Sequence, residues 1–118
     1  MFTRLILAIM LVESGGDSAA HGDRDKWGAW QSHGSLQIKQ CVIDDVNRWT
    51  GQSLTVDDVH DDTIARECFV LYMLHYATQK RLGRRVTDQD RYRIWNGGPD
   101  GWREYETIKN WKKVREHL

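Results

Sequence analysis

The chain has 118 residues, the usual size of one domain and too few for a second domain of normal size. Its 17 basic and 17 acidic side chains give a formal net charge of zero, so no overall field favours nucleic acid or an anionic membrane surface. Six Trp and four Tyr are more than a core of this size needs, and surplus aromatic side chains commonly line clefts that hold ring-shaped ligands such as sugars. We therefore expect one monomeric domain, residues 1–118, that does not bind nucleic acid.

The first apolar stretch, residues 5–12, ends at a single carboxylate, Glu13. The sequence predicts a helix over 3–13, with Thr3 as its N-cap and Gly15 or Gly16 after its end. The N-terminus resembles the charged and apolar regions of an export signal, but we interpret the run as a buried helix, and it is too short to span a bilayer. A carboxyl group half desolvated by apolar neighbours has a raised pKa, which a general acid near neutral pH requires. An arbitrary Glu in this position more often ends a helix and points into water.

Residues 14–33 show neither helical nor strand periodicity and are rich in Gly, Ser, Asp and His, which predicts a long loop. Long loops in compact domains are commonly functional. Trp27 and Trp30 within it could stack on sugar rings or equally pin the loop to the body of the protein. The next segment, residues 34–38, could form a small strand or the turn into the following helix.

The remaining segments show apolar residues at helical spacing. Residues 62–82 are apolar on nearly all faces between Cys68 and Leu74, which predicts a central buried helix ended by Gly83. Thr87 and Asp90 have the spacing of a capping box. The expected helices cover residues 3–13, 40–49, 62–82, 88–95 and 105–118, with a short helical turn through 55–59. The predicted class is all-α, or α+β with a minimal β element near residues 35–38, and about six helices in all.

Two cysteines, Cys41 and Cys68, fall on what we interpret as the inner faces of helices, which favours two buried free thiols over one disulfide. The five histidines show no short spacing typical of metal ligands. No metal and no cofactor is expected.

Three separated motifs occur in a fixed order: E-S-G-G at 13–16, G-S-L-Q-I at 34–38 and W-N-G-G-P at 95–99. Together they resemble the lysozyme-like lytic transglycosylases of the soluble lytic transglycosylase (SLT) family and their goose-type lysozyme relatives, which carry E-S-x-x, G-L-M-Q-I and Y-N-x-G-P. The pattern looks most like small phage-type or bacterial members. The resemblance implies a lysozyme-like fold in which the helices surround a buried central helix beside a substrate cleft.

Carried over residue by residue, the resemblance implies that Glu13 is the catalytic acid and base. Trp95 departs from the family, which most often has a Tyr there; an indole donates a hydrogen bond but cannot accept one. Tyr72 lies on the predicted central helix, where a core role, with or without a hydroxyl that reaches the cleft, is expected. The substrate-binding residues so expected are Ser14, Leu36, Gln37, Tyr72, Trp95, Asn96 and Gly97.

The implied reaction is cleavage of the β-1,4 bond between N-acetylmuramic acid and N-acetylglucosamine in peptidoglycan, at the bacterial cell wall, by a phage-encoded or periplasmic enzyme. The motifs assign no second carboxylate, so the substrate's own acetamido group would stabilise the developing cation. Transfer to the muramyl 6-hydroxyl defines a lytic transglycosylase, and transfer to water defines a hydrolytic lysozyme.

Other interpretations stay open at this point. Asp17, Asp23 or Asp25 could serve as a second carboxylate, although solvated loop acids are the simpler interpretation. A non-catalytic peptidoglycan-binding or structural module would keep the same fold without turnover. A Trp-rich nucleic-acid binder would need a basic stripe among the aromatic residues, which the sequence lacks.

Overall fold

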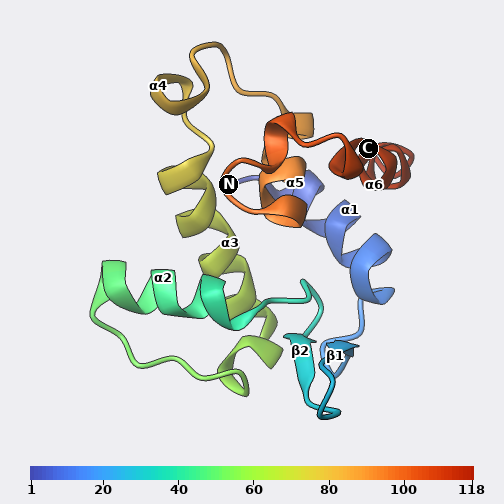
Figure 1. The fold of residues 1–118 in the computed structure, drawn as a ribbon, viewed down its shortest axis with the longest axis vertical. Helices are drawn as coiled ribbons and strands as arrows, with labels where there is room; N and C mark the ends of the chain where they lie inside the picture. The colour runs from blue at the N-terminus through green and yellow to red at the C-terminus, as the bar shows by residue number, and fades with distance from the viewer. The chain divides into compact units, whose positions relative to one another are not determined.

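The computed structural model describes all residues from Met1 to Leu118 and is mostly helical, with one small sheet (Figure 1). The contacts within the chain define two compact units, which we call the terminal unit, residues 1–9 and 69–118, and the middle unit, residues 10–68. The expectation of a single domain stays a prediction. The helices are α1 (Thr3–Ser14), α2 (Gln40–Thr50), α3 (Asp62–Tyr76), α4 (Gln79–Leu82), α5 (Asp88–Gly97) and α6 (Glu106–Arg115), the 3₁₀ turns are η1 (Asp58–His60) and η2 (Gly101–Arg103), and the strands are β1 (His21–Arg24) and β2 (Trp30–His33).

The terminal unit is built on the packing of α5 against η2 and α6. The buried Arg93 donates from Nε to Thr107 Oγ1 at 2.7 Å and from Nη2 to the Glu104 carbonyl at 2.9 Å. Only glycine fits at position 101, because a Cβ there would lie 2.0 Å from the Arg93 carbonyl oxygen. The buried apolar side chains of this unit are Leu5, Ile6, Ala8, Ile9, Phe69, Tyr72, Met73, Leu82, Tyr92, Ile94, Trp111 and Val114.

The middle unit combines α2 with an antiparallel hairpin, β1 paired with β2 (Figure 1). Helix α2 matches its predicted range closely and ends as expected at Gly51, whose φ of +73° is left-handed. The hairpin pairs His21 with His33. The buried apolar side chains of this unit are Met10, Leu36, Ile38, Val42, Ile43, Val46, Val59, Ala65 and Cys68.

The prediction of a long loop over 14–33 is wrong for residues 21–33, which form the hairpin. Of the two options for residues 34–38, the structure has the turn, with an isolated bridge between His33 and Ile38 as its β element. Strand β1 is largely exposed, and the two buried residues of β2, Ser32 and His33, are polar, so the strands carry no alternation of apolar residues to reveal them.

The predicted continuous helix over 62–82 is wrong at its C-terminal end. Helix α3 stops at Tyr76, and α4 begins after Thr78, whose side chain caps the new helix by accepting from the Arg81 amide at 3.1 Å. Nor is every face of α3 buried, since Leu74 is 52 % exposed. Leu7 and Leu11 likewise leave one exposed stripe on α1, where full burial was expected. Tyr105, the first residue of the helix predicted over 105–118, precedes α6 and is exposed.

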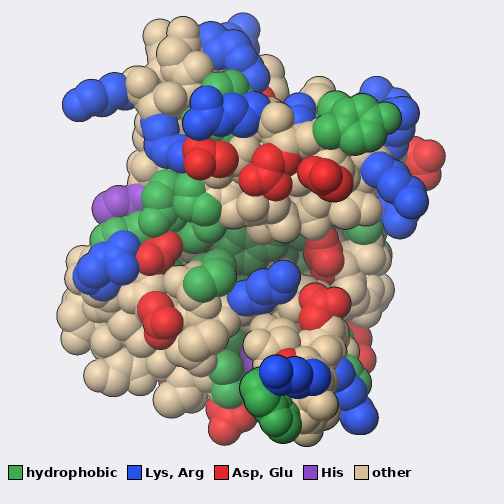
Figure 2. Space-filling model, viewed as in Figure 1, with side chains coloured by type: hydrophobic (Ala, Val, Ile, Leu, Met, Phe, Trp, Pro, Cys, Tyr) green, Lys and Arg blue, Asp and Glu red, His purple; other side chains and the backbone are tan.

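On the face shown in Figure 2, basic and acidic side chains are intermixed. No helix has the length and apolar character needed to cross a membrane.

The two cysteines are both free thiols, but they differ in accessibility. Cys68 is buried on α3, as expected, and burial raises the pKa of its thiol to about 11. Cys41 is exposed on α2, which corrects the expectation that both are buried: it precedes the buried pair Val42 and Ile43 and faces away from them.

We expect iodoacetamide to alkylate Cys41 in the folded protein and to leave Cys68 unmodified, because only a thiolate that solvent can reach reacts. Peptide mass spectrometry after brief labelling measures this. In denaturant both residues should react, and equal rates in the folded state would contradict the assignment.

Helix α5 begins with the capping box that the sequence predicts. Thr87 Oγ1 accepts from the Asp90 amide at 3.3 Å, and Asp90 Oδ2 accepts from the Thr87 amide at 2.9 Å. Arg84 adds two hydrogen bonds of 2.7 Å to the same carboxylate, one to each oxygen. Burial alone would raise the pKa of Asp90, but the hydrogen bonds from Arg84 and Thr87 outweigh it and hold that pKa below its ordinary value.

We expect Asp90→Ala to lower the free energy of unfolding by about 1–2 kcal/mol at neutral pH, because the Thr87 amide and the Arg84 guanidinium lose the carboxylate that accepts from them. Because the folded-state pKa is depressed, this contribution is present above the unfolded pKa of about 3.9 and is lost as pH falls through the folded value. Urea unfolding of both proteins between neutral pH and pH 2 measures this. The difference in the free energy of unfolding between wild type and Asp90→Ala should become smaller below about pH 4.

The control is Asp88→Ala, which removes an exposed carboxylate from the same first turn of α5. If the difference in the free energy of unfolding between wild type and Asp90→Ala does not change with pH, the role assigned to the Asp90 carboxylate is contradicted.

Candidate functional site

The C-terminal end of α1 holds Glu13 and Ser14 in the middle unit. Glu13 is half-buried at the last turn of the helix. Ser14 Oγ contacts two carbonyl oxygens, that of Met10 at 3.1 Å and that of Ser35 at 2.8 Å. The helix then ends at Gly15 and Gly16, both with positive φ, as predicted. The serine hydroxyl thus links the end of α1 to the segment that contains the second motif.

That second segment, residues 34–38, is a tight turn closed at both ends. The His33 amide donates to the Ile38 carbonyl at 3.0 Å, and the Ile38 amide donates back to His33 at 2.8 Å. Gly34 is required there, because its φ is +79° and a Cβ would lie 2.6 Å from the Val59 carbonyl oxygen. Leu36 is fully buried and anchors the turn in the core.

Gln37 adopts a left-handed backbone, with φ of +50°, although it is not a glycine. Such a residue is uncommon and persists where the surroundings over-determine it. Its Nε2 donates to the Gly34 carbonyl at 2.9 Å, and its Oε1 occupies the position that a Cβ on Gly22 would take. The amide side chain is therefore held between the turn and strand β1.

The three acids considered as a second carboxylate have different surroundings. Asp25 accepts hydrogen bonds from the amides of Trp27 and Ala29, both at 2.9 Å, and so closes the turn of the hairpin. Asp17 accepts from the Ala19 amide at 2.9 Å. Asp23 lies on β1 and accepts from Ser32 Oγ at 2.9 Å, with no backbone amide to cap.

Trp27 and Trp30 lie on the hairpin, 80 % and 40 % exposed. Lys26 Nζ is 4.4 Å from the centre of the Trp27 ring, and the Arg24 guanidinium is 4.1 Å from that of Trp30. Neither indole is buried, so both remain candidates for stacking on a ligand. The exposure of Trp27 does not support the alternative that it pins the loop to the body of the protein.

Tyr72 and Trp95 belong to the terminal unit. The Tyr72 ring is 4 % exposed and meets the Trp95 ring edge to face, with centroids 5.5 Å apart. Trp95 also packs against Phe69 at 4.9 Å. Tyr72 is therefore mainly a core residue, and the contact of its hydroxyl with substrate stays a prediction.

The third motif forms the end of α5 and the turn that follows it. Asn96 Oδ1 accepts from Asn110 Nδ2 of α6 at 3.1 Å. A Cβ on Gly97 would lie 2.7 Å from Thr107 Cγ2, so no larger residue fits without movement. Gly98 ends the helix by donating to the Ile94 carbonyl at 2.9 Å. The expected roles of Asn96 and Gly97 in binding stay predictions.

The expected site residues thus fall into two groups. Glu13, Ser14, Leu36 and Gln37 come together in the middle unit through the Ser14 to Ser35 hydrogen bond. Tyr72, Trp95, Asn96 and Gly97 lie in the terminal unit, along α3 and α5.

One group of chemically active residues has no counterpart in the sequence reasoning: His21, His33 and His60. Their ligand-type nitrogens all lie within 4.8 Å of one another in the middle unit. They come from β1, β2 and η1, so no short spacing reveals them. A prediction of the hairpin would have placed two of them together, because His21 lies opposite His33 in its register.

A scan against models of protein families finds no match for the chain, and a search of curated proteins finds none either. Among solved structures, the chain is similar to Tapes japonica lysozyme, with 25 % identity and a TM-score of 0.77 over 96 % of this chain and 87 % of the other. It is also similar to a chain in the crystal structure of Aeromonas hydrophila PliI in complex with Meretrix lusoria lysozyme, with 27 % identity, a TM-score of 0.78 and the same coverage. The mostly helical chain with its small two-stranded sheet therefore has a lysozyme-like fold.

Proposed function

We propose that this protein cleaves the β-1,4 bond between N-acetylmuramic acid and N-acetylglucosamine in peptidoglycan, with Glu13 as the general acid and base. The observation that carries the proposal is the position of Glu13 in a lysozyme-like fold: it ends α1, beside a serine that is hydrogen-bonded to the turn of Gln37. Half-burial at the end of an apolar helix suits a carboxyl group that must hold a proton near neutral pH.

In the proposed reaction, protonated Glu13 donates to the glycosidic oxygen as the C1–O bond breaks and an oxocarbenium-like centre develops. The Gln37 turn binds the N-acetyl group beside that bond. Glu13, now a carboxylate, accepts the proton of the attacking hydroxyl as the new C1–O bond forms. One residue thus serves both halves of the reaction, and the carboxyl group ends the cycle protonated.

The attacking hydroxyl decides the product. The three motifs resemble lytic transglycosylases, which use the muramyl 6-hydroxyl, whereas the neighbour from Tapes japonica is named a lysozyme. We favour water as the acceptor, because Asp23 offers a second carboxylate that is not engaged in capping a turn of its own backbone. Asp17 and Asp25 serve such turns.

Glu13→Gln keeps the size of the side chain but removes the proton that the reaction transfers. We expect the rate of clearing of a peptidoglycan suspension to fall by roughly 100- to 10,000-fold, the usual worth of general acid catalysis. Turbidity at matched protein concentration measures the rate.

The matched control is Glu116→Gln, the same chemical change at an exposed position after α6. It should clear the suspension as fast as wild type. If Glu13→Gln and wild type clear the suspension equally, the catalytic proposal fails. If neither clears it and both still sediment with peptidoglycan, the protein is a binding module instead.

Mass spectrometry of the digest distinguishes the two acceptors. Hydrolysis leaves reducing ends, and transfer to the 6-hydroxyl leaves 1,6-anhydro ends that are lighter by one water. We expect reducing ends from wild type, and a lower yield of them from Asp23→Asn because the oxocarbenium-like centre loses the second carboxylate that would stabilise it. Anhydro ends as the sole product would contradict hydrolysis and establish a lytic transglycosylase.

A further inference from the structure

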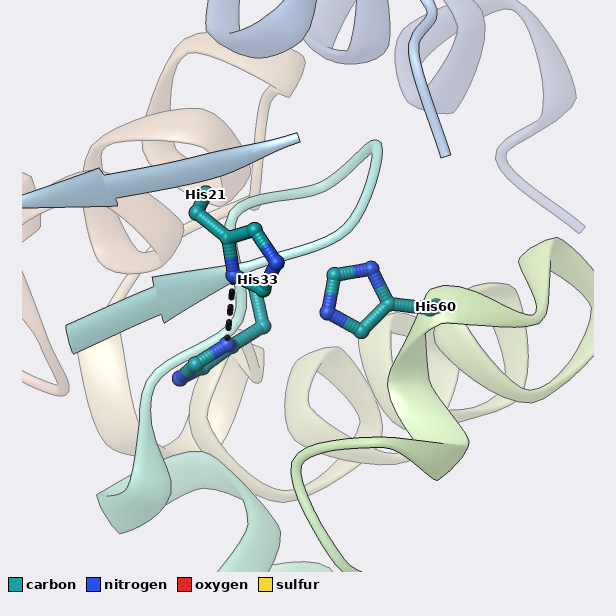
Figure 3. A group of neighbouring side chains, drawn as sticks. All are labelled: His21, His33 and His60. Atoms are coloured by element: carbon teal, nitrogen blue, oxygen red, sulfur yellow. Dashed lines mark hydrogen bonds between the residues drawn. The ribbon is translucent and has the colours of Figure 1, made fainter. Parts of the chain in front are cut away.

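Three imidazole rings from three separate elements converge in the middle unit. His21 lies on β1, His33 on β2 and His60 at the end of η1, and Figure 3 shows the His60 ring pointing toward the other two. One ligand-type nitrogen from each lies within 4.8 Å of the others. Three histidines that meet in this way have the composition of a transition-metal site with three protein ligands.

The pairing of the strands sets the spacing of the first two rings. His21 and His33 are direct partners across the hairpin, so their side chains lie on the same face of the sheet. Their Nδ1 atoms are 3.3 Å apart (Figure 3). Two nitrogens that bind one zinc ion tetrahedrally at about 2.0–2.1 Å are themselves about 3.3 Å apart. The hairpin thus already holds two nitrogens at the separation that a zinc ion needs.

The third ring is oriented by a contact on its far side. His60 Nδ1 lies 2.7 Å from the Ser18 carbonyl oxygen, which can only accept, so the proton of the neutral ring is on Nδ1. Nε2 is then the atom with a lone pair. A histidine ligand that donates its other N–H to a backbone carbonyl is the usual arrangement around bound metals, because it fixes the tautomer and the ring orientation.

The burial of His33 and a neighbouring hollow complete the geometry of the group. His33 is 7 % exposed, and burial, followed by the neighbouring His21 and His60, lowers its pKa below the ordinary value of 6.5. A hollow of about 370 Å³, lined by Ser18, Ala19, His21, Asp57 and His60, gives an ion a path from solvent.

We propose that His21, His33 and His60 bind a divalent transition-metal ion of the zinc class, with the fourth position open to the adjacent hollow. The ion joins the hairpin to η1 and so stabilises the middle unit. Binding requires His60 Nε2 to approach the other two nitrogens by a small rotation of its side chain. This inference does not depend on the proposed glycan cleavage.

The test is titration of the full chain, after removal of metals with a chelator, with zinc chloride alone. Isothermal calorimetry should show one saturable ion per chain. At zinc concentrations about 100-fold above the dissociation constant, the melting temperature should rise by roughly 5 °C or more. Magnesium and calcium, which prefer oxygen ligands, should not replace zinc. Cobalt should give the intense visible absorption of a site with four ligands or five.

The decisive variant is His60→Gln, because His60 is only partly buried and lies outside the two paired strands. We expect it to weaken zinc binding by roughly 100-fold or more. His117→Gln, at an exposed position near the C-terminus, should bind as wild type does. Glu13→Gln should also bind normally, which separates this site from the proposed catalysis.

Absence of saturable zinc binding by wild type, or equal affinity in wild type and His60→Gln, would overturn the proposal. The three rings would then be a hydrogen-bonded and stacked group that only stabilises the hairpin. Circular dichroism of His60→Gln without metal checks that the variant is folded, so that a loss of binding is attributable to the missing ligand.

Discussion

The hydrogen bond between Ser14 Oγ and the Ser35 carbonyl, 2.8 Å long, is the constraint on which the candidate site in the middle unit depends. It joins the end of α1, where Glu13 lies, to a turn that follows the whole hairpin in sequence. The turn itself is fixed by the bridge between His33 and Ile38 and by a Ser35 Oγ hydrogen bond to Asp62 of 2.6 Å at the start of α3. One buried serine thus receives a bond from one helix and gives a bond to another, and Gln37 takes its unusual backbone conformation between them.

The hairpin serves two separate purposes in this arrangement. Its outer surface exposes Trp27 and carries Asp23, features suited to a polar ligand with ring faces. Its other contribution is the pairing of His21 with His33, beside His60 on η1. Because the strands are short and bury only Ser32 and His33 of β2, side-chain contacts must supply much of the hairpin's stability, since a two-stranded hairpin is marginal by itself in water. The Asp25 turn supplies one such contact, and the histidine group supplies another.

The terminal unit shows how strongly small residues can determine a local structure. Gly97 and Gly101 both lie where a Cβ would collide, the first with Thr107 and the second with the Arg93 backbone. These close approaches let Arg93 bury its guanidinium against Thr107 and Glu104. The W-N-G-G-P motif therefore has a packing role that stands whatever its role in binding, and its similarity to a family motif is partly a requirement of the fold.

The sequence alone determined the features that depend on neighbours along the chain. It placed α1, α2, the capped start of α5 and the glycine ends of α1 and α2, because helix periodicity and caps are local. It also supplied the motifs that predict Glu13, Ser14 and Gln37 as one group. In the structure, the hydrogen bond from Ser14 to Ser35 joins the end of α1 to the turn that contains Gln37. Tertiary structure alone decided the hairpin, the exposure of Cys41 and the meeting of the three histidines. Each of these follows from strand pairing or from which helix face is covered, and such contacts between distant residues leave no periodic trace in the sequence.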